Sequence, residues 1–215
     1  MRILALDASL AQCSAALWQD GSVLVERVVP GERGHAASLP PLVAIILAEA
    51  GLAAPALDAL AAVIGPGGFT GIRTALALAE GIALATGRPL IGVTTGEALR
   101  AALPAADIAS PVWAAIDNRR GRIVLETFHP DTPPRALALD ALPLAPLGLV
   151  VVGDAAPQVL ASLAVRGCTA RLGGGITLPK AGAAATVAAA RLAGTLPPCP
   201  ARPLYVEPPA VRPPA

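Results

Sequence analysis

Residues 63–93, VIGPGGFTGIRTALALAEGIALATGRPLIGV, constrain the fold more than any other part of the chain. The apolar segment at 60–64 predicts a buried strand, and the glycine-rich turn at 65–71 leads from it into a helix predicted over 70–86. Another short apolar strand follows at 90–93. Strands that alternate with helices in this way predict an α/β protein.

The predicted helices are bounded by residues that favour helix ends. Thr70 is the candidate N-cap of the helix after the turn, and Gly87 and Pro89 lie just past its end. Thr94 and Glu97 form a capping-box pattern, which predicts that a further short helix begins there.

The turn itself, Gly65-Pro66-Gly67-Gly68-Phe69-Thr70-Gly71, has the setting of an anion site, because a helix N-terminus offers unpaired N–H groups and a favourable dipole. Its G-x-G-x-x-x-G spacing is one residue off the dinucleotide fingerprint, and it lacks the Gly-Lys-Ser/Thr of a P-loop. The alternative is a tight turn that lets the helix pack closely on its strand. Spacing alone leaves both interpretations open.

A carboxylate and a hydroxyl, in Asp7-Ala8-Ser9, end the first predicted strand. They are positioned as phosphate-handling folds place their metal-and-phosphate turn. Ordinary turn chemistry, in which Asp7 and Ser9 bond nearby backbone amides, also accounts for them and is favoured when the segment is taken alone.

The order of predicted elements divides the chain into two lobes, split near 104–111. The expected elements outside 60–93 are strands at 3–6, 13–18 and 23–29, a helix at 36–50, a helix from 95 to about 103, strands at 112–116, 123–128 and 149–152, and a helix at 180–193. An Asp20-Gly21 turn predicts a hairpin of the second and third strands. We therefore predict a first lobe at 1–104, a second lobe at 105–200 and a proline-rich tail at 201–215.

Composition and the sparse reactive residues disfavour several function classes. A net charge of +1 with 14% charged residues gives no electrostatic footprint for direct nucleic-acid binding. No proline-free apolar run reaches the roughly 18–20 residues that span a bilayer, and the first apolar run is too short for a signal peptide. The three cysteines match neither a disulfide framework nor a zinc site. We expect a soluble, cytoplasmic protein with no membrane contact.

The sequence contains few residues in the patterns that metal-dependent or nucleophilic catalysis requires. His35 and His129 show neither HExxH nor HxxxH spacing, and there is no G-x-S-x-G elbow. We therefore expect no catalytic residues and no metal site.

Two predicted helices of the first lobe have almost no water-facing stripe. The run at 42–48 is apolar at every position, and the helix at 74–86 carries one charge inside it. A helix that is apolar all round is normally covered on all sides, so the side away from the sheet needs a second lobe or another protein. Two such helices would suit an interface of roughly 800 Å² per partner. The alternative is an alanine-rich surface that tolerates water and is partly covered by the second lobe.

The segment Asn118-Arg119-Arg120-Gly121-Arg122 concentrates polar residues between two predicted strands. Arg119 and Arg120 are candidates for contact with a partner interface or an anion. A solvated turn accounts for them equally simply and is favoured locally.

Several strings of sequence together resemble the TsaB (YeaZ) family. They are ILALDAS at 3–9 with the Gly21 hairpin, GPGGFTGIRTALALAEGIAL, RPLIGVTT and IDNRRG, with weaker similarity at 152–154 and 203–206. The resemblance runs from residue 3 to about 128, and the Gly-Pro-Gly-x-Phe-Thr-Gly-Ile-Arg string is highly specific.

This resemblance implies an actin-like ATPase-domain (ASKHA) fold, α/β in class, with two RNase-H-like lobes. It implies a non-catalytic subunit of the bacterial tRNA threonylcarbamoyladenosine machinery. Such a subunit pairs with the catalytic paralogue TsaD, and the ATPase subunit TsaE is a third member. TsaD transfers the threonylcarbamoyl group to an adenosine beside the tRNA anticodon, so tRNA is reached through the complex. The resemblance implies no cofactor of its own, with ATP or ADP only at the interface with the partner.

The resemblance also assigns an interface, because in that family the two helices of the first lobe pair with those of the partner. Carried over residue by residue, the interface comprises Leu42, Ile45, Ile46, Glu49, Ile72, Arg73, Leu76, Ala79 and Ala83. The first four follow i, i+3, i+4, i+7 spacing. Without a partner, the same helices predict a homodimer.

The chain departs from the family pattern at the groups that would handle a ligand. Asp-Thr-Ser is Asp7-Ala8-Ser9 here, Gly-Pro-Gly-Ser ends in Gly68, and His-Ser-Glu is His35-Ala36-Ala37. The expected phosphate loop is therefore vestigial; it comprises Asp7, Ser9, Gly65, Gly67, Gly68, Thr70 and Gly71. The rival functions are a nucleotide-dependent kinase or transferase of the same fold, and a peptidase.

Overall fold

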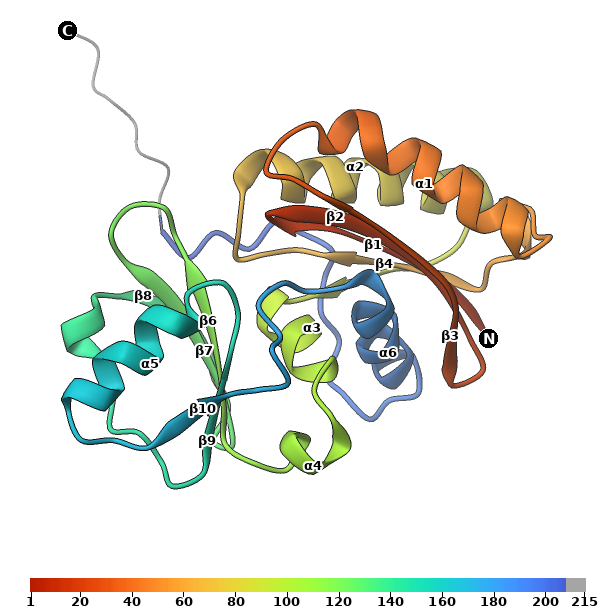
Figure 1. The fold of residues 1–215 in the computed structure, drawn as a ribbon. Coiled ribbons are helices and arrows are strands. Elements are labelled where there is room, and N and C mark those ends of the chain that lie inside the picture. Colours follow the sequence, from red (N-terminus) through yellow and green to blue (C-terminus); the bar gives the residue numbers. More distant parts are fainter. Residues whose placement is uncertain (208–215) are drawn as a thin grey trace, which may run out of the picture.

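The computed structural model describes residues 1–207, which form two lobes, each built on a five-stranded sheet (Figure 1). The first sheet has the order β3-β2-β1-β4-β5. Its strands are β1 (Arg2–Leu10), β2 (Gln12–Gln19), β3 (Ser22–Pro30), β4 (Ala59–Val63) and β5 (Leu90–Val93). The first three are antiparallel, and β4 and β5 run parallel to β1. The predicted hairpin is confirmed, with Asp20 and Gly21 at positive φ in its turn.

Helices cover both faces of the first sheet. On one face lie α1 (His35–Glu49) and α2 (Phe69–Thr86), which pack on alternate residues of β1 such as Leu4 and Leu6. On the other face lie α3 (Thr95–Ala101) and α6 (Ala181–Leu192), which pack on the intervening residues Ile3 and Ala5. The alternation of side chains along a strand therefore gives this lobe two cores.

The position of α6 corrects the predicted lobe boundary. The helix was assigned to the second lobe at 105–200, but its buried residues pack on the first sheet. Its contact face is almost entirely alanine and glycine, so the helix approaches closely; a Cβ at Gly182 would lie 2.8 Å from Val23 Cγ2. Sequence order alone could not place it, because these contacts join the two ends of the chain.

The second sheet has the order β10-β9-β6-β7-β8. Its elements are β6 (Val112–Asp117), β7 (Ile123–Phe128), β8 (Thr132–Leu137), β9 (Leu149–Val152), β10 (Ala170–Leu172) and α5 (Ala156–Val165), with α4 (Ala105–Ile108) before them and short 3₁₀ turns at Ala54–Ala56 and Leu139–Ala141. The elements α4, α5, β8 and β10 were not predicted. Strand β8 contains Pro133 and Pro134, which an edge strand tolerates because one side of it has no ladder.

Two helix ends test the predicted caps. Helix α2 begins at Phe69 with Gly68 as its N-cap, so the assignment of Thr70 as N-cap is wrong. The capping box is confirmed: Glu97 N donates to Thr94 Oγ1 at 3.0 Å, and Thr94 N donates to Glu97 Oε2 at 2.8 Å.

The last described residues, 199–207, form an extended segment that we call the C-terminal strap. Gly92 N of β5 donates to the Cys199 carbonyl at 3.0 Å, and Leu204 N donates to the Ile64 carbonyl at 2.8 Å. Further on, Glu207 accepts a hydrogen bond from Asn118 at 2.8 Å, so the strap joins the first lobe to the second. Residues 201–207 contain no helix or strand, as predicted for the tail, and 208–215 lie outside the described residues.

Within residues 1–207, no helix combines the length and the apolar character needed to cross a membrane.

Candidate functional site

The glycine-rich turn lies directly on the end of β1. Gly68 N donates to the Ser9 carbonyl at 2.7 Å. A Cβ at Gly67 would lie 2.9 Å from the Ser9 carbonyl carbon and overlap its oxygen, and a Cβ at Gly71 would overlap the Ala8 carbonyl oxygen. These two glycines are therefore required for close backbone packing between the turn and β1, whether or not a ligand binds.

Asp7 and Ser9 lie at the end of β1 and are fully buried. Ser9 N donates to Asp7 Oδ1 at 2.9 Å, which is the turn chemistry considered from the sequence. Burial raises the pKa of Asp7 to about 7, against the opposing effect of the hydrogen bond from Ser9 N. Among residues 1–207, neither Asp7 Oδ2 nor Ser9 Oγ has a hydrogen-bond partner. Ser9 borders the interlobe cleft, whereas Asp7 is enclosed within the protein.

A cleft of about 1110 Å³ separates the two lobes at this point. The segments that line it are the end of β1, the loop into α1, the turn and first residues of α2, the β6–β7 loop and the C-terminal strap. It contains five of the seven residues of the predicted phosphate loop, Ser9, Gly67, Gly68, Thr70 and Gly71, together with both Arg119 and Arg120. The structure thus brings most of these residues together, but leaves Asp7 and Gly65 outside the lining.

Two of the arginines that line the cleft, Arg119 and Arg73, contact other groups of the protein. Arg119 lies 3.4 Å from Glu32, 3.6 Å from Asp154 and 3.8 Å from Asp117. The Arg73 guanidinium lies over an aromatic ring, and no lysine lines the cleft. Arg33 also lines the cleft, and we derive no phosphoryl chemistry from this arrangement. Among residues 1–207, no group of three or more His, Cys, Asp or Glu side chains is arranged to hold a metal ion.

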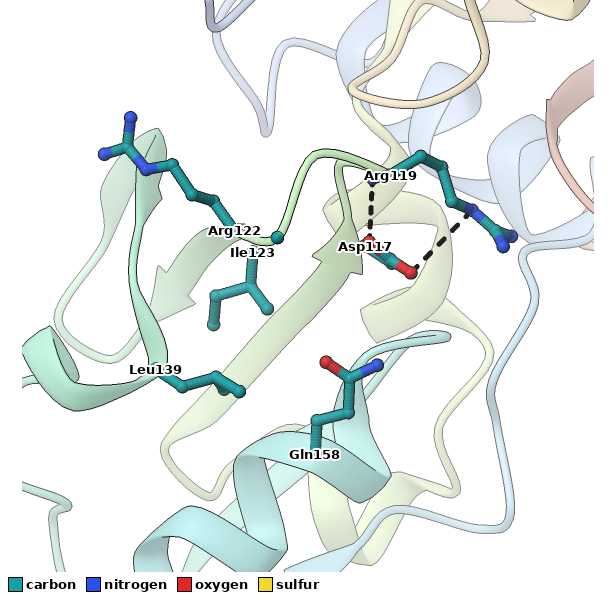
Figure 2. A pocket seen from close by; sticks show the side chains of 7 residues that line it. Asp117, Arg119, Arg122, Ile123, Leu139 and Gln158 are labelled. Atoms are coloured by element: carbon teal, nitrogen blue, oxygen red, sulfur yellow. Dashed lines mark hydrogen bonds and ion pairs between the residues drawn. The ribbon is translucent and has the colours of Figure 1, made fainter.

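A smaller hollow of about 440 Å³ lies between the β6–β7 loop and α5 (Figure 2). Figure 2 shows Arg119 bonded back to Asp117, at 2.7 Å from its backbone N to Asp117 Oδ1. The Arg122 guanidinium binds Glu207 at 2.6 Å and the Ala136 carbonyl at 2.7 Å. These pairings organise the β6–β7 loop and leave the hollow without an unmatched arginine.

Most of the predicted interface side chains are buried inside the first lobe. These are Leu42, Ile46, Ile72, Leu76, Ala79 and Ala83, all within the core that α1 and α2 form with the sheet. Their assignment to a partner surface is therefore corrected. Of the i, i+3, i+4, i+7 stripe on α1, Leu42 and Ile46 face the sheet whereas Ile45 and Glu49 are exposed, so the periodicity does not separate the sheet-facing side from a partner-facing one.

The outer side of α1 and α2 is exposed and largely apolar, and we call it the α1–α2 outer face. Of the predicted residues it contains Ile45, Glu49 and Arg73. Ile45 is 44% exposed and Leu84 is 84% exposed. The other exposed residues that compose it are Pro41, Ala44, Ala48, Ala77, Glu80 and Gly81.

Two side chains from the start of α2 meet one from the C-terminal strap at one end of this face. Phe69 and Tyr205 stack with ring centroids 5.5 Å apart, and both are about half exposed. Arg73 lies 3.8 Å over the Phe69 ring, and its Nε donates to Tyr205 Oη at 2.8 Å. Sequence reasoning identified Arg73 but missed both rings. The sequence did offer one signal for the rings. The chain has only five aromatic residues, and two of them are Phe69 in the glycine-rich turn and Tyr205 in the proline-rich tail.

A buried carboxyl group joins the two lobes on the other side of the cleft. Both oxygens of Glu126, on β7, lie 2.9 Å from Thr94 Oγ1 of the first lobe. Glu97 beside it pairs with Arg191 of α6 at 2.5 Å. Burial, with the nearby charge of Glu97 as the second cause, raises the pKa of Glu126 to about 8.

This carboxyl group predicts that the stability of the chain falls as the pH rises. Between the ordinary glutamate value of 4.5 and about 8, the unfolded chain has lost the Glu126 proton and the folded chain retains it. Unfolding therefore releases a proton, and its free energy decreases by on the order of 1 kcal/mol per pH unit. Asp7 acts in the same direction, but its contribution fades as the pH rises through about 7, so Glu126 contributes most of the decrease between pH 7 and 8.

Glu126→Gln is expected to reduce the pH 7–8 decrease by more than half while keeping the Thr94 hydrogen bond. Urea denaturation at pH 5, 7 and 8 measures this, with the exposed Glu80→Gln as the matched control that keeps the decrease. An unchanged pH 7–8 decrease in Glu126→Gln would show that the proton belongs to another group.

Comparison with known proteins gives consistent matches. The family model of TsaD, tRNA N6-adenosine threonylcarbamoyltransferase, matches residues 27–129. The tRNA threonylcarbamoyladenosine biosynthesis protein TsaB of Escherichia coli K12 is 38% identical over 132 residues, or 61% of this chain. The chain spans just over half the length of the curated relatives it matches, 56% and 52% for the TsaB proteins of E. coli and Haemophilus influenzae.

Solved structures extend the match over nearly the whole chain. YeaZ from Pseudomonas aeruginosa superimposes with a TM-score of 0.78 and 26% identity, over 95% of this chain and all of that one. Component A of (R)-2-hydroxyglutaryl-CoA dehydratase from Acidaminococcus fermentans, at 12% identity and a TM-score of 0.54, shares the fold alone. The predicted actin-like, two-lobed α/β architecture is thus confirmed. The chain is thus similar in sequence to the TsaB proteins over part of its length, and similar in structure to YeaZ over nearly its full length.

Proposed function

We propose that this chain is a non-catalytic subunit that binds and activates the catalytic paralogue TsaD in threonylcarbamoyl transfer to the tRNA adenosine next to the anticodon. The similarity to TsaB supports the process, since the TsaB relatives are named for threonylcarbamoyladenosine biosynthesis. The supporting role rests on the structure of the chain itself.

The observation that carries the proposal is the α1–α2 outer face. Ile45 and Leu84 leave apolar side chains in water on neighbouring helices, and the face carries few charges. Exposed apolar patches of this kind mark protein interaction sites. The TsaD family model matches residues 27–129, a range that includes both helices, so the proposed partner has an equivalent helix pair to pack against.

The arrangement at the cleft supports a role without catalysis. Asp7 is enclosed and partly protonated near neutral pH, and Arg73 and Arg119 are matched by protein groups. The rival function, a nucleotide-dependent transferase or kinase, would need a cation and a carboxylate presented to the phosphates. A peptidase would need a nucleophile and a base placed together, and neither histidine lies in such a pair.

The same proposal covers the rest of the assembly. The chain forms a homodimer through the α1–α2 outer face when TsaD is absent, and TsaE joins the complex as ATPase subunit. Any ATP or ADP binds only between this chain and TsaD, tRNA binds through the complex, and the assembly is cytoplasmic.

Mixing the purified chain with TsaD from the same organism tests this function. Light scattering after size-exclusion chromatography is expected to show a heterodimer that replaces the homodimer, and the chain alone is expected not to turn over ATP. Steady ATP hydrolysis by the chain alone would favour the active transferase instead. Absence of any complex at micromolar concentrations would reject the proposed partner.

A further inference from the structure

The exposed rings of Phe69 and Tyr205 stand in line with the exposed side of α2. Phe69, Arg73, Ala77, Glu80 and Leu84 are all exposed and follow one another at intervals of three or four residues, so they form one continuous stripe. The strap adds Tyr205 to the end of this stripe by stacking it on Phe69.

We propose that Phe69, Arg73 and Tyr205 form a second anchor of the partner surface, so that the C-terminal strap is part of the TsaD-binding site. This inference rests on the proposed function, because it takes the same partner. It adds a segment that the helix pair alone would not include.

The rings are held in place before any partner arrives. Arg73 fixes Tyr205 through its Nε and covers Phe69 with its guanidinium. The strap on either side is fixed by Leu204, whose N donates to the Ile64 carbonyl, and by Glu207, which binds Asn118 and Arg122. Large aromatic side chains that lose little freedom on binding, with arginine, are the residues that most often dominate interface energies.

The exposed area of the rings is large enough to matter to an interface. Phe69 is 51% exposed and Tyr205 is 43% exposed. Aromatic side chains bury 150–250 Å² each, so the two rings offer roughly 200 Å², about a quarter of the ~800 Å² that one partner contributes to a standard interface.

The charges favour a protein occupant over nucleic acid. The cluster contains one cation, and Arg73 directs its guanidinium onto Phe69 and its Nε to Tyr205. A phosphate backbone would find little to bind there, and the chain has a net charge of only +1. A folded partner with an apolar helix pair, continuous with the α1–α2 outer face, fits the stripe.

Titration of the full-length chain with TsaD tests the inference in four variants: Phe69→Ala, Tyr205→Ala, Tyr205→Phe and Ile45→Glu. Truncation of either ring is expected to weaken binding about tenfold, whereas Tyr205→Phe keeps the stacked ring and is expected to bind within threefold of the parent. Leu144→Ala is the matched control, since Leu144 is 87% exposed in the second lobe, away from the stripe. Thermal unfolding of each variant checks that the fold is retained.

The outcomes separate this inference from the proposed function. If Phe69→Ala or Tyr205→Ala lowers the affinity for TsaD by less than fivefold while Ile45→Glu still binds poorly, the anchor is wrong and the proposed function stands. If Ile45→Glu and the ring variants all bind normally, TsaD binds elsewhere on the chain and the anchor is wrong, whereas no binding by the parent chain would reject the proposed function itself. If the ring variants lose affinity for isolated tRNA rather than for TsaD, the rings serve RNA and the inference is wrong.

Discussion

Replacing Ile45 with glutamate is expected to abolish binding of the catalytic partner while leaving the isolated chain folded. Ile45 is 44% exposed on the outer side of α1, so the new carboxylate stays hydrated in the free chain. In the complex it would be buried without a counter-charge, which costs about 3–5 kcal/mol. That is a loss of more than about 100-fold in affinity, measurable by calorimetric titration.

Two comparisons make this result specific to the surface. Leu147→Glu places the same charge on a residue that is 97% exposed in the second lobe, and is expected to leave the affinity unchanged. Leu76→Glu is not a usable test, because Leu76 is 6% exposed and belongs to the core of the first lobe. Unaltered affinity in Ile45→Glu would show that the partner binds elsewhere.

Replacing Gly71 with alanine is expected to destabilise the first lobe by about 3 kcal/mol. The added Cβ would lie 3.1 Å from the Ala8 carbonyl carbon, overlap its oxygen, and lie 3.0 Å from His35 Nδ1. The two Ala8 atoms belong to the backbone of the buried strand β1 and cannot shift easily, so α2 would have to move away from β1.

The matched control lies in the same helix. A Cβ at Gly81 would meet nothing within 4 Å, so Gly81→Ala is expected to stabilise the chain by about 0.5–1 kcal/mol through helix propensity. Urea denaturation of both variants measures the difference. Equal midpoints would mean that the turn does not pack on β1 as the structure shows.

Local patterns predicted much of the first lobe correctly. The Asp20-Gly21 hairpin and the Thr94 capping box depend on residues that are close in sequence, so each could be identified from its own signature. Strand β8 could not, because Pro133 and Pro134 normally argue against a strand and only an edge position accommodates them.

The candidate site was predicted only in part, because its decisive contacts are long-range. The sequence identified α1 and α2, but periodicity did not separate Leu42 and Ile46, which the sheet covers, from the exposed Ile45. Tyr205 reaches Arg73 across 132 positions of sequence, and no local pattern marks such a contact. Likewise, the alanine-rich side of α6 could pack on the sheet of either lobe, so the sequence alone does not say which one it covers.

The central claim is tested most directly by measuring threonylcarbamoyl transfer to tRNA by purified TsaD and TsaE, with and without this chain. We predict that transfer requires the chain, that the chain alone transfers nothing, and that Ile45→Glu fails to support transfer at concentrations where the parent chain does. Equal transfer by TsaD in the absence of the chain, or transfer by the chain alone, would contradict the claim.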